Sequence, residues 1–173
     1  MPRTGANYIN PWRYADAGTV VDGAVDISLM TRLAPLLVSS AGSATYRLEF
    51  ALDDGAVPRV NGRISARVEM ICQRCLEPMV VEIASEVRLG LVRSRDDPGP
   101  DDAEPLVAEN ERLSLAALVE DELILALPPA PLHVSGACLP PAAPRAGPDP
   151  AAAGGGPFDA LAALVSRGDP SDR

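Results

Sequence analysis

Two alternating stretches of sequence, Arg63-Ile-Ser-Ala-Arg-Val-Glu-Met70 and Val81-Glu-Ile-Ala-Ser-Glu-Val-Arg-Leu89, decide the fold. In the first, apolar residues occupy the even positions, and Cys72 continues that parity. In the second they occupy the odd positions, with Ser85 as the one polar exception. Because successive side chains of a β-strand point to opposite faces, each stretch predicts a strand with one buried and one hydrated face. The interruption at 73–78 predicts a turn, which places the Cys72-Gln-Arg-Cys75 motif at the tip of a hairpin.

The segments before and after this hairpin predict a further strand and two helices. Residues 45–52 alternate in the same way and end at Asp53-Asp54-Gly55, which predicts a third strand of an antiparallel meander. Residues 114–127 predict an amphipathic helix, with Ser114 as its N-cap and Pro128 preventing its continuation. Residues 28–38 predict a shorter amphipathic helix, weakened by Pro35. The apolar face of the longer helix comprises Leu115, Leu118, Val119, Leu123 and Ala126.

We therefore predict an α+β domain, in which an antiparallel β-meander packs one amphipathic helix against its apolar face. This single domain spans residues 1–127, including an N-terminal arm at 1–19. Residues 128–156 form a Pro/Ala/Gly-rich linker that contains an island with His133 and Cys138. Residues 157–167 are expected to form a short, tethered C-terminal helix.

Charge and hydropathy narrow the classes of function. The chain of 173 residues has a formal net charge of −9, which disfavours broad binding of nucleic acid and suits a basic protein partner. A local basic patch remains open. Its candidates are Arg59, Arg63, Arg67 and Arg74, and the last three are the residues that an RNA-binding module would use. Residues 1–10 lack a signal-peptide core, and no apolar stretch reaches membrane-spanning length, so we expect a cytoplasmic protein without membrane contact.

The cysteine motif suggests a metal site. A CxxC pair can direct two thiolates to one tetrahedral zinc ion but supplies only half of its ligands. His133 and Cys138 are the remaining His and Cys residues of the chain, so the candidate set is Cys72, Cys75, His133 and Cys138. A reduced pair that merely serves a tight turn is the alternative. Thiol-disulfide catalysis is disfavoured because the chain after Cys75 resumes as a strand, whereas redox CxxC motifs open a helix.

The acidic triplet Glu120-Asp121-Glu122 lies on the longer predicted helix. It could contact a basic partner or simply form a solvated face. Paired carboxylates can also perform acid-base chemistry, but the sequence offers no partner for it, since it contains one His, no glycine-rich phosphate loop and no nucleophile elbow. We therefore predict a protein that is not an enzyme and has no catalytic residue.

The order of these motifs resembles the YceD family, the large ribosomal RNA subunit accumulation proteins. The resemblance is carried by Ile71-Cys-Gln-Arg-Cys-Leu-Glu-Pro-Met79, by Leu118-Val-Glu-Asp-Glu-Leu-Ile-Leu-Ala-Leu-Pro128, by His133 and Cys138, and by Pro157-Phe158. It implies a role in the synthesis, processing or stability of 23S ribosomal RNA. The expected partners are a large-subunit precursor, a ribosomal protein or a biogenesis factor. A zinc-stabilised RNA-binding module and, less favoured, an RNA-processing enzyme are the alternatives.

Overall fold

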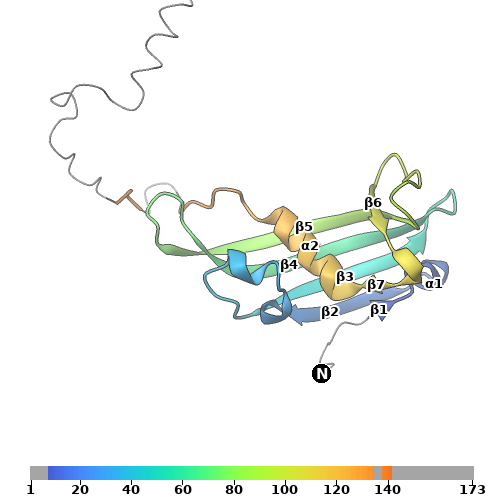
Figure 1. The fold of residues 1–173 in the computed structure, drawn as a ribbon, viewed down its shortest axis with the longest axis horizontal. Helices are drawn as coiled ribbons and strands as arrows, with labels where there is room; N and C mark the ends of the chain where they lie inside the picture. The colour runs from blue at the N-terminus through green and yellow to red at the C-terminus, as the bar shows by residue number, and fades with distance from the viewer. Residues whose placement is uncertain (1–7, 135–137, 142–173) are drawn as a thin grey trace, which may run out of the picture. The chain divides into compact units, whose positions relative to one another are not determined.

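The computed structural model describes residues 8–134 and 138–141 and confirms the α+β class. Its main sheet has five strands in the order β2-β3-β4-β5-β6 (Figure 1). Each of β2 to β5 pairs antiparallel with its neighbour, whereas β6 runs parallel to β5. The strands are β2 (Val20–Asp26), β3 (Ser43–Leu52), β4 (Pro58–Ile71), β5 (Pro78–Val92) and β6 (Glu104–Val107).

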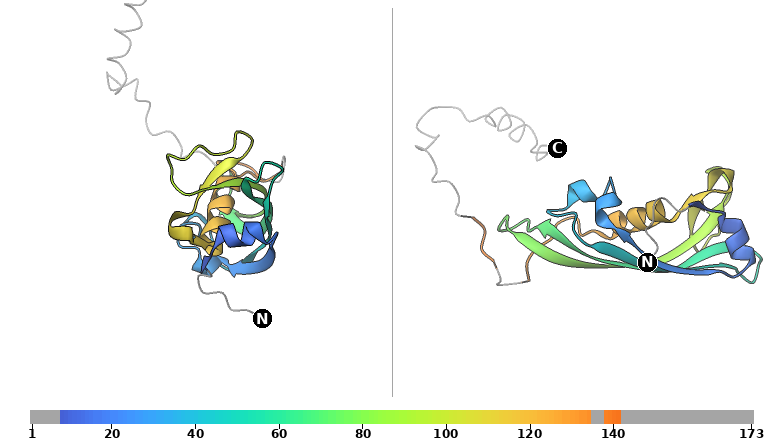
Figure 2. Two further views of the ribbon diagram at one scale, coloured as in Figure 1. Left: turned by 90° about the vertical axis from the view of Figure 1, so that its right-hand side faces the viewer. Right: turned by 90° about the horizontal axis from the view of Figure 1, so that it is seen from below.

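One face of this sheet carries the hydrophobic core. The helix α2 (Leu115–Ala126) lies across that face, and the opposite face has no helix over it among the described residues (Figure 2). The Ser114 hydroxyl caps α2 by accepting a hydrogen bond from the Ala117 N–H at 3.2 Å. The inward side chains of the strands alternate with exposed ones, as the sequence predicts. The largest fully buried side chains include Phe50, Leu48, Ile64, Val119 and Leu123.

A small second sheet closes one end of the core. It consists of β1 (Tyr8–Ile9) paired antiparallel with β7 (Leu113–Ser114). Between β1 and β2 lies α1 (Pro11–Asp16), capped by the Asn10 side chain, which accepts a hydrogen bond from the Arg13 N–H at 3.1 Å. The Arg93 guanidinium stacks 4.6 Å from the centroid of the Trp12 ring. These contacts attach the N-terminal segment from Tyr8 onward to the sheet.

The prediction of an amphipathic helix at residues 28–38 was wrong. This segment forms two short 3-10 turns instead, Ile27–Leu29 and Ala34–Leu36. Pro35 lacks a backbone N–H, and burial of Met30 and Leu33 at the sheet stabilises turns that point both side chains inward. A later 3-10 turn, Glu109–Glu111, precedes β7.

The chain divides into two units, residues 1–139 and residues 140–173. The C-terminal helix predicted at 157–167 and most of the linker predicted at 128–156 lie outside the described residues. In the described part, no helix is both long and apolar enough to span a membrane.

Candidate metal centre

The connection between β4 and β5 contains the CxxC motif. The last cross-strand pair is Ile71 with Pro78, and the Cys72 N–H then donates to the Glu77 carbonyl at 2.9 Å. The Leu76 N–H donates to the Cys72 carbonyl at 2.9 Å, and Leu76 has a left-handed backbone with φ of 64°. This tight turn folds Cys75 back beside Cys72.

The segment after α2 reaches the same turn (Figure 1). The Gln73 N–H donates to the Pro131 carbonyl at 2.8 Å, and the His133 N–H donates to the Cys72 sulfur at 3.5 Å. These two backbone contacts fix residues 131–133 against the turn. They bring His133 next to a motif that lies 58 residues earlier in the chain.

Four potential ligand atoms converge here. The sulfur atoms of Cys72, Cys75 and Cys138 and a ring nitrogen of His133 all lie within 4.8 Å of one another. The Cys72 and Cys138 sulfurs are 3.8 Å apart, and the Cys75 sulfur is 3.4 Å from His133 Nδ1. Cys72 is fully buried, and the other three side chains are half-buried. The residues predicted from the sequence to share a metal ion therefore lie close together and could bind one.

Two thiols of this cluster, those of Cys72 and Cys138, have strongly shifted pKa values. Burial alone would raise the pKa of the Cys72 thiol, but the surrounding backbone N–H groups of Cys75, His133 and Arg74 have the larger combined effect and lower its pKa to about 5. Burial and the neighbouring Cys75 and Cys72 sulfurs raise the pKa of the Cys138 thiol to about 11. The pocket thus favours the Cys72 thiolate and disfavours a Cys138 thiolate unless a cation compensates the charge.

The acidic triplet on α2 is largely engaged within the protein. Glu120 is only 7% exposed, and its carboxylate accepts hydrogen bonds from the backbone N–H groups of Arg32 and Leu33. Asp121 is exposed and forms an ion pair with the Arg32 guanidinium. Glu122 accepts a hydrogen bond from the Ser85 hydroxyl at 3.1 Å. The sequence does not predict that Arg32 contacts Glu120 and Asp121, because these contacts require the turn that contains Arg32 to pack against α2.

The three basic residues that an RNA-binding module would use do not form one patch. Arg63 and Arg67 lie on the open face of the sheet, whereas Arg74 belongs to the cysteine turn. On the open face, Arg63 forms an ion pair with Glu86 at 2.9 Å, and Arg67 lies opposite Glu82 in the strand register.

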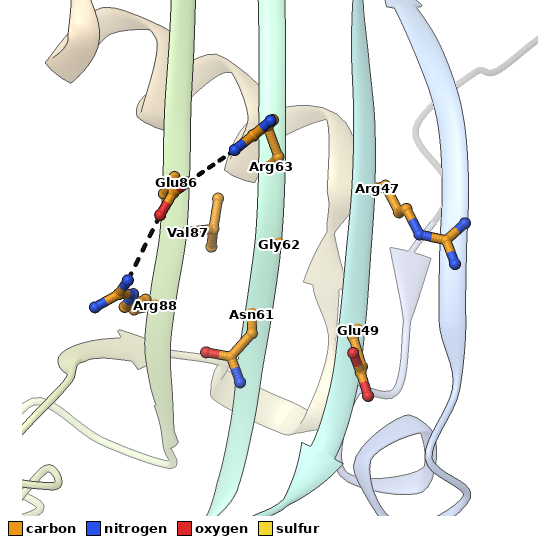
Figure 3. A pocket seen from close by; sticks show the side chains of 8 residues that line it. All are labelled: Arg47, Glu49, Asn61, Gly62, Arg63, Glu86, Val87 and Arg88. Carbon is orange, nitrogen blue, oxygen red and sulfur yellow. Dashed lines mark hydrogen bonds and ion pairs between the residues drawn. The ribbon is translucent and has the colours of Figure 1, made fainter.

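A shallow hollow of about 520 Å³ surrounds Arg63 on the open face. Figure 3 shows Glu86 between Arg63 and Arg88, with Arg47 turned away from this group. Basic and acidic side chains therefore alternate across the open face.

Comparison with known proteins identifies the family. The family model described as "Large ribosomal RNA subunit accumulation protein YceD" matches residues 60–165, more than half of the chain. This chain belongs to the YceD family. The matched range includes the four residues of the candidate metal centre, and it confirms the family predicted from the sequence motifs.

A curated relative gives a second YceD match. The Large ribosomal RNA subunit accumulation protein YceD of Haemophilus influenzae is 35% identical over 112 residues, which cover 63% of this chain and 64% of the relative. The alignment therefore spans less than two thirds of that YceD protein. No solved structure matches this chain.

Proposed function

We propose that this chain is a cytoplasmic, non-enzymatic ribosome biogenesis factor. It supports the synthesis, processing or stability of 23S ribosomal RNA by binding to an assembling large subunit or to a protein associated with it. The observation that carries this proposal is the YceD match over residues 60–165, which includes the convergent Cys and His residues. The name of the relative from Haemophilus influenzae supports the same process.

The Cys72, Cys75, His133 and Cys138 cluster is proposed to hold one structural zinc ion. A tetrahedral zinc with Zn–S bonds of about 2.3 Å and a Zn–N bond of about 2.0 Å separates two sulfurs by about 3.8 Å and a sulfur from a nitrogen by about 3.5 Å. In this structure the Cys72 and Cys138 sulfurs are 3.8 Å apart, and the Cys75 sulfur is 3.4 Å from His133 Nδ1. Three sulfurs and one nitrogen complete the four-ligand set of a closed, structural zinc site.

This assignment favours binding over catalysis. Catalytic zinc ions keep one coordination position for water or substrate, and the four ligands proposed here would fill all of them. The one histidine of the chain, His133, belongs to the cluster and is then not free to act as a general acid or base. The metal would join residues 131–138 to the β4–β5 turn and fix the surface around it.

A protein partner is favoured over bare RNA. The open face of the sheet interleaves acidic side chains with Arg63 and Arg67, and the formal net charge of the chain is −9. Both features weaken attraction for a phosphate backbone. They suit a basic protein, such as a ribosomal protein at the surface of an assembling subunit.

The test uses cells that lack the gene and carry plasmid-borne variants. The wild-type chain is expected to restore the ratio of 23S to 16S ribosomal RNA and to co-sediment with large-subunit precursors. Cys72→Ser/Cys75→Ser should do neither, whereas Glu77→Gln, an exposed change in the same turn, should behave as wild type. A wild-type protein that neither alters the ratio nor co-sediments with any precursor would contradict the proposal.

A further inference from the structure

The strand β5 has an unpaired edge over much of its length. Its inner side pairs with β4 from Pro78 to Gly90, but its outer side pairs with β6 only from Leu89 to Val92 (Figure 1). Within the described residues, no strand pairs with the outer side of β5 between Glu82 and Arg88. This stretch, which we call the β5 edge, is therefore available for an added strand.

The ladder register identifies the free backbone groups. The Cys72 N–H donates to the Glu77 carbonyl, so Cys72 and Glu77 form a hydrogen-bonded cross-strand pair. This pair lies directly beyond the last ladder pair, Ile71 with Pro78. Such pairs alternate along an antiparallel ladder, so the odd-numbered residues of β5 bond to β4. The even-numbered residues then direct their N–H and C=O groups outward. In agreement, the Val92 carbonyl accepts the Ala108 N–H on the outer side at 3.0 Å. The outward residues of the β5 edge are Glu82, Ala84, Glu86 and Arg88.

Acidic side chains flank the β5 edge on both faces of the sheet. Glu82 and Glu86 lie on the open face and are exposed. On the helix face, Glu122 contacts Ser85 of β5, and Glu104 begins β6 opposite Leu89. Burial, together with the Glu104 and Asp121 charges, raises the pKa of Glu122 despite the Ser85 hydrogen bond.

Two further features fit an added strand. Arg88, the one basic side chain of the β5 edge, contacts Glu86 at 3.5 Å, and the chain contains no lysine to protect an edge. Leu125, three residues after Glu122 on α2, is 71% exposed and offers an apolar contact on the same side of the helix.

We propose that the β5 edge binds an extended segment of a basic protein as an additional strand, with alternating basic and apolar residues. Backbone hydrogen bonds to the outward groups supply affinity, and the flanking carboxylates select basic side chains. The proposal rests on the proposed function for its cellular setting and names the chemistry of the partner. A second copy of the chain is disfavoured, because antiparallel self-pairing centred on Ala84 would place Glu82 opposite Glu86 of the copy.

A peptide titration tests the chemistry. The probes are a short peptide of alternating Arg and Val and a matched peptide of alternating Glu and Val, measured against the full chain by fluorescence anisotropy. The Arg-Val peptide should bind and the Glu-Val peptide should not. Ala84→Pro removes one outward N–H without touching the β4 ladder and should weaken binding by about tenfold, whereas Ala84→Val keeps the N–H and should stay within about twofold.

A charge-reversal variant keeps the test decisive if Ala84→Pro fails to fold. Glu82→Arg should weaken binding of the Arg-Val peptide and strengthen binding of the Glu-Val peptide, a reversal that misfolding cannot produce. Amide hydrogen exchange supplies the structural readout: the amides of Glu82, Ala84, Glu86 and Arg88 should gain protection in the complex. Equal binding by Ala84→Pro and Ala84→Val, or binding without this protection, would overturn the proposal.

Co-sedimentation separates this inference from the proposed function. If the wild-type chain co-sediments with large-subunit precursors and Ala84→Pro does so equally, the proposed function stands and the β5 edge is not its contact surface. Loss of co-sedimentation in Ala84→Pro but not in Ala84→Val supports the edge as the contact. If the wild-type chain neither restores the ratio of 23S to 16S ribosomal RNA nor co-sediments, the proposed function is contradicted, and the peptide titration alone decides whether the β5 edge binds a basic strand.

Discussion

The carboxylate of Glu120 accepts a hydrogen bond from the backbone N–H of Leu33 at 3.1 Å, which joins α2 to the turn segment between β2 and β3. The neighbouring Arg32 N–H donates to the same carboxylate at 2.6 Å, and its guanidinium adds an ion pair at 3.0 Å. The buried Glu120 carboxylate thus accepts hydrogen bonds from two backbone N–H groups that do not take part in a helix or a strand ladder. The Glu120 carboxylate therefore holds the turn segment against α2.

Glu120→Gln should destabilise the fold. The neutral amide is a weaker acceptor and its NH₂ group can face the Arg32 and Leu33 donors, so we expect the free energy of unfolding to fall by about 1–3 kcal/mol. Urea unfolding followed by circular dichroism measures the change. Asp121→Asn, at the exposed neighbouring position, should cost less than about 0.5 kcal/mol. Equal effects of the two substitutions would argue against a buried role for Glu120.

The same carboxylate predicts a pH dependence. Burial acts to raise the pKa of Glu120, but the Arg32 and Leu33 N–H groups and the Arg32 guanidinium outweigh it and lower the pKa below its usual value. A lowered folded-state pKa stabilises the fold above the unfolded-state pKa of about 4.3, and this stability is lost as pH falls through the folded-state value. Wild type should therefore lose more stability than Glu120→Gln between about pH 6 and pH 3. Parallel stability curves would contradict this linkage.

Zinc removal should loosen one end of the molecule without unfolding it. Protein purified without chelator is expected to hold about one zinc ion per chain under reducing conditions, measured by elemental analysis. Cys72→Ser should lose most of this metal, and Glu77→Gln should retain it. Because the core around Phe50 and Ile64 lies in the sheet, a chelator should lower the melting temperature by several degrees and leave the far-ultraviolet spectrum nearly unchanged. Less than about a tenth of an equivalent in wild type would rule out the zinc assignment.

Gly62 is expected to be intolerant of any side chain. An added Cβ would lie 2.1 Å from the Arg47 carbonyl oxygen and 3.0 Å from the Leu48 Cα, so the β3 backbone would have to move. Gly62→Ala should lower the free energy of unfolding by about 1–3 kcal/mol. Gly55→Ala is the matched control, since its nearest contact is the Asp53 side chain at 3.4 Å. Urea unfolding that ranks the two variants equally would show that β3 and β4 can separate at this point.

The sequence predicts the central strands well because their alternation is regular. It does not reveal β2, whose inward positions are Val21, Gly23 and Val25. The glycine breaks the apolar pattern, and the structure explains it, since a Cβ there would come within 2.7 Å of the Tyr46 hydroxyl oxygen. The sequence does not reveal the short strand β6 either, because it has only four residues and follows an acidic loop.

The candidate metal centre was predictable in composition but not in geometry. The CxxC spacing, together with His133 and Cys138, identifies the four candidate ligands from the sequence. Their approach depends on the Gln73 to Pro131 backbone hydrogen bond, which no residue pattern encodes. The internal role of Glu120 was hidden for the same reason, because its backbone donors lie 88 and 87 residues away in the chain.

The open face of the sheet should bind RNA weakly. Arg63 is paired with Glu86, and Arg67 faces Glu82, so a phosphate approaching either arginine also meets a carboxylate. We expect the slope of log affinity against log salt for a fragment of 23S ribosomal RNA to be shallower than about −1, since each neutralised phosphate of a single strand contributes about −0.7. Arg63→Ala/Arg67→Ala should change the affinity by less than about twofold. Filter binding across a salt series provides the measurement, with Glu82→Gln/Glu86→Gln as the matched variant that exposes both arginines and should strengthen binding. A steep slope in wild type, abolished by the double arginine substitution, would instead favour the RNA-binding module.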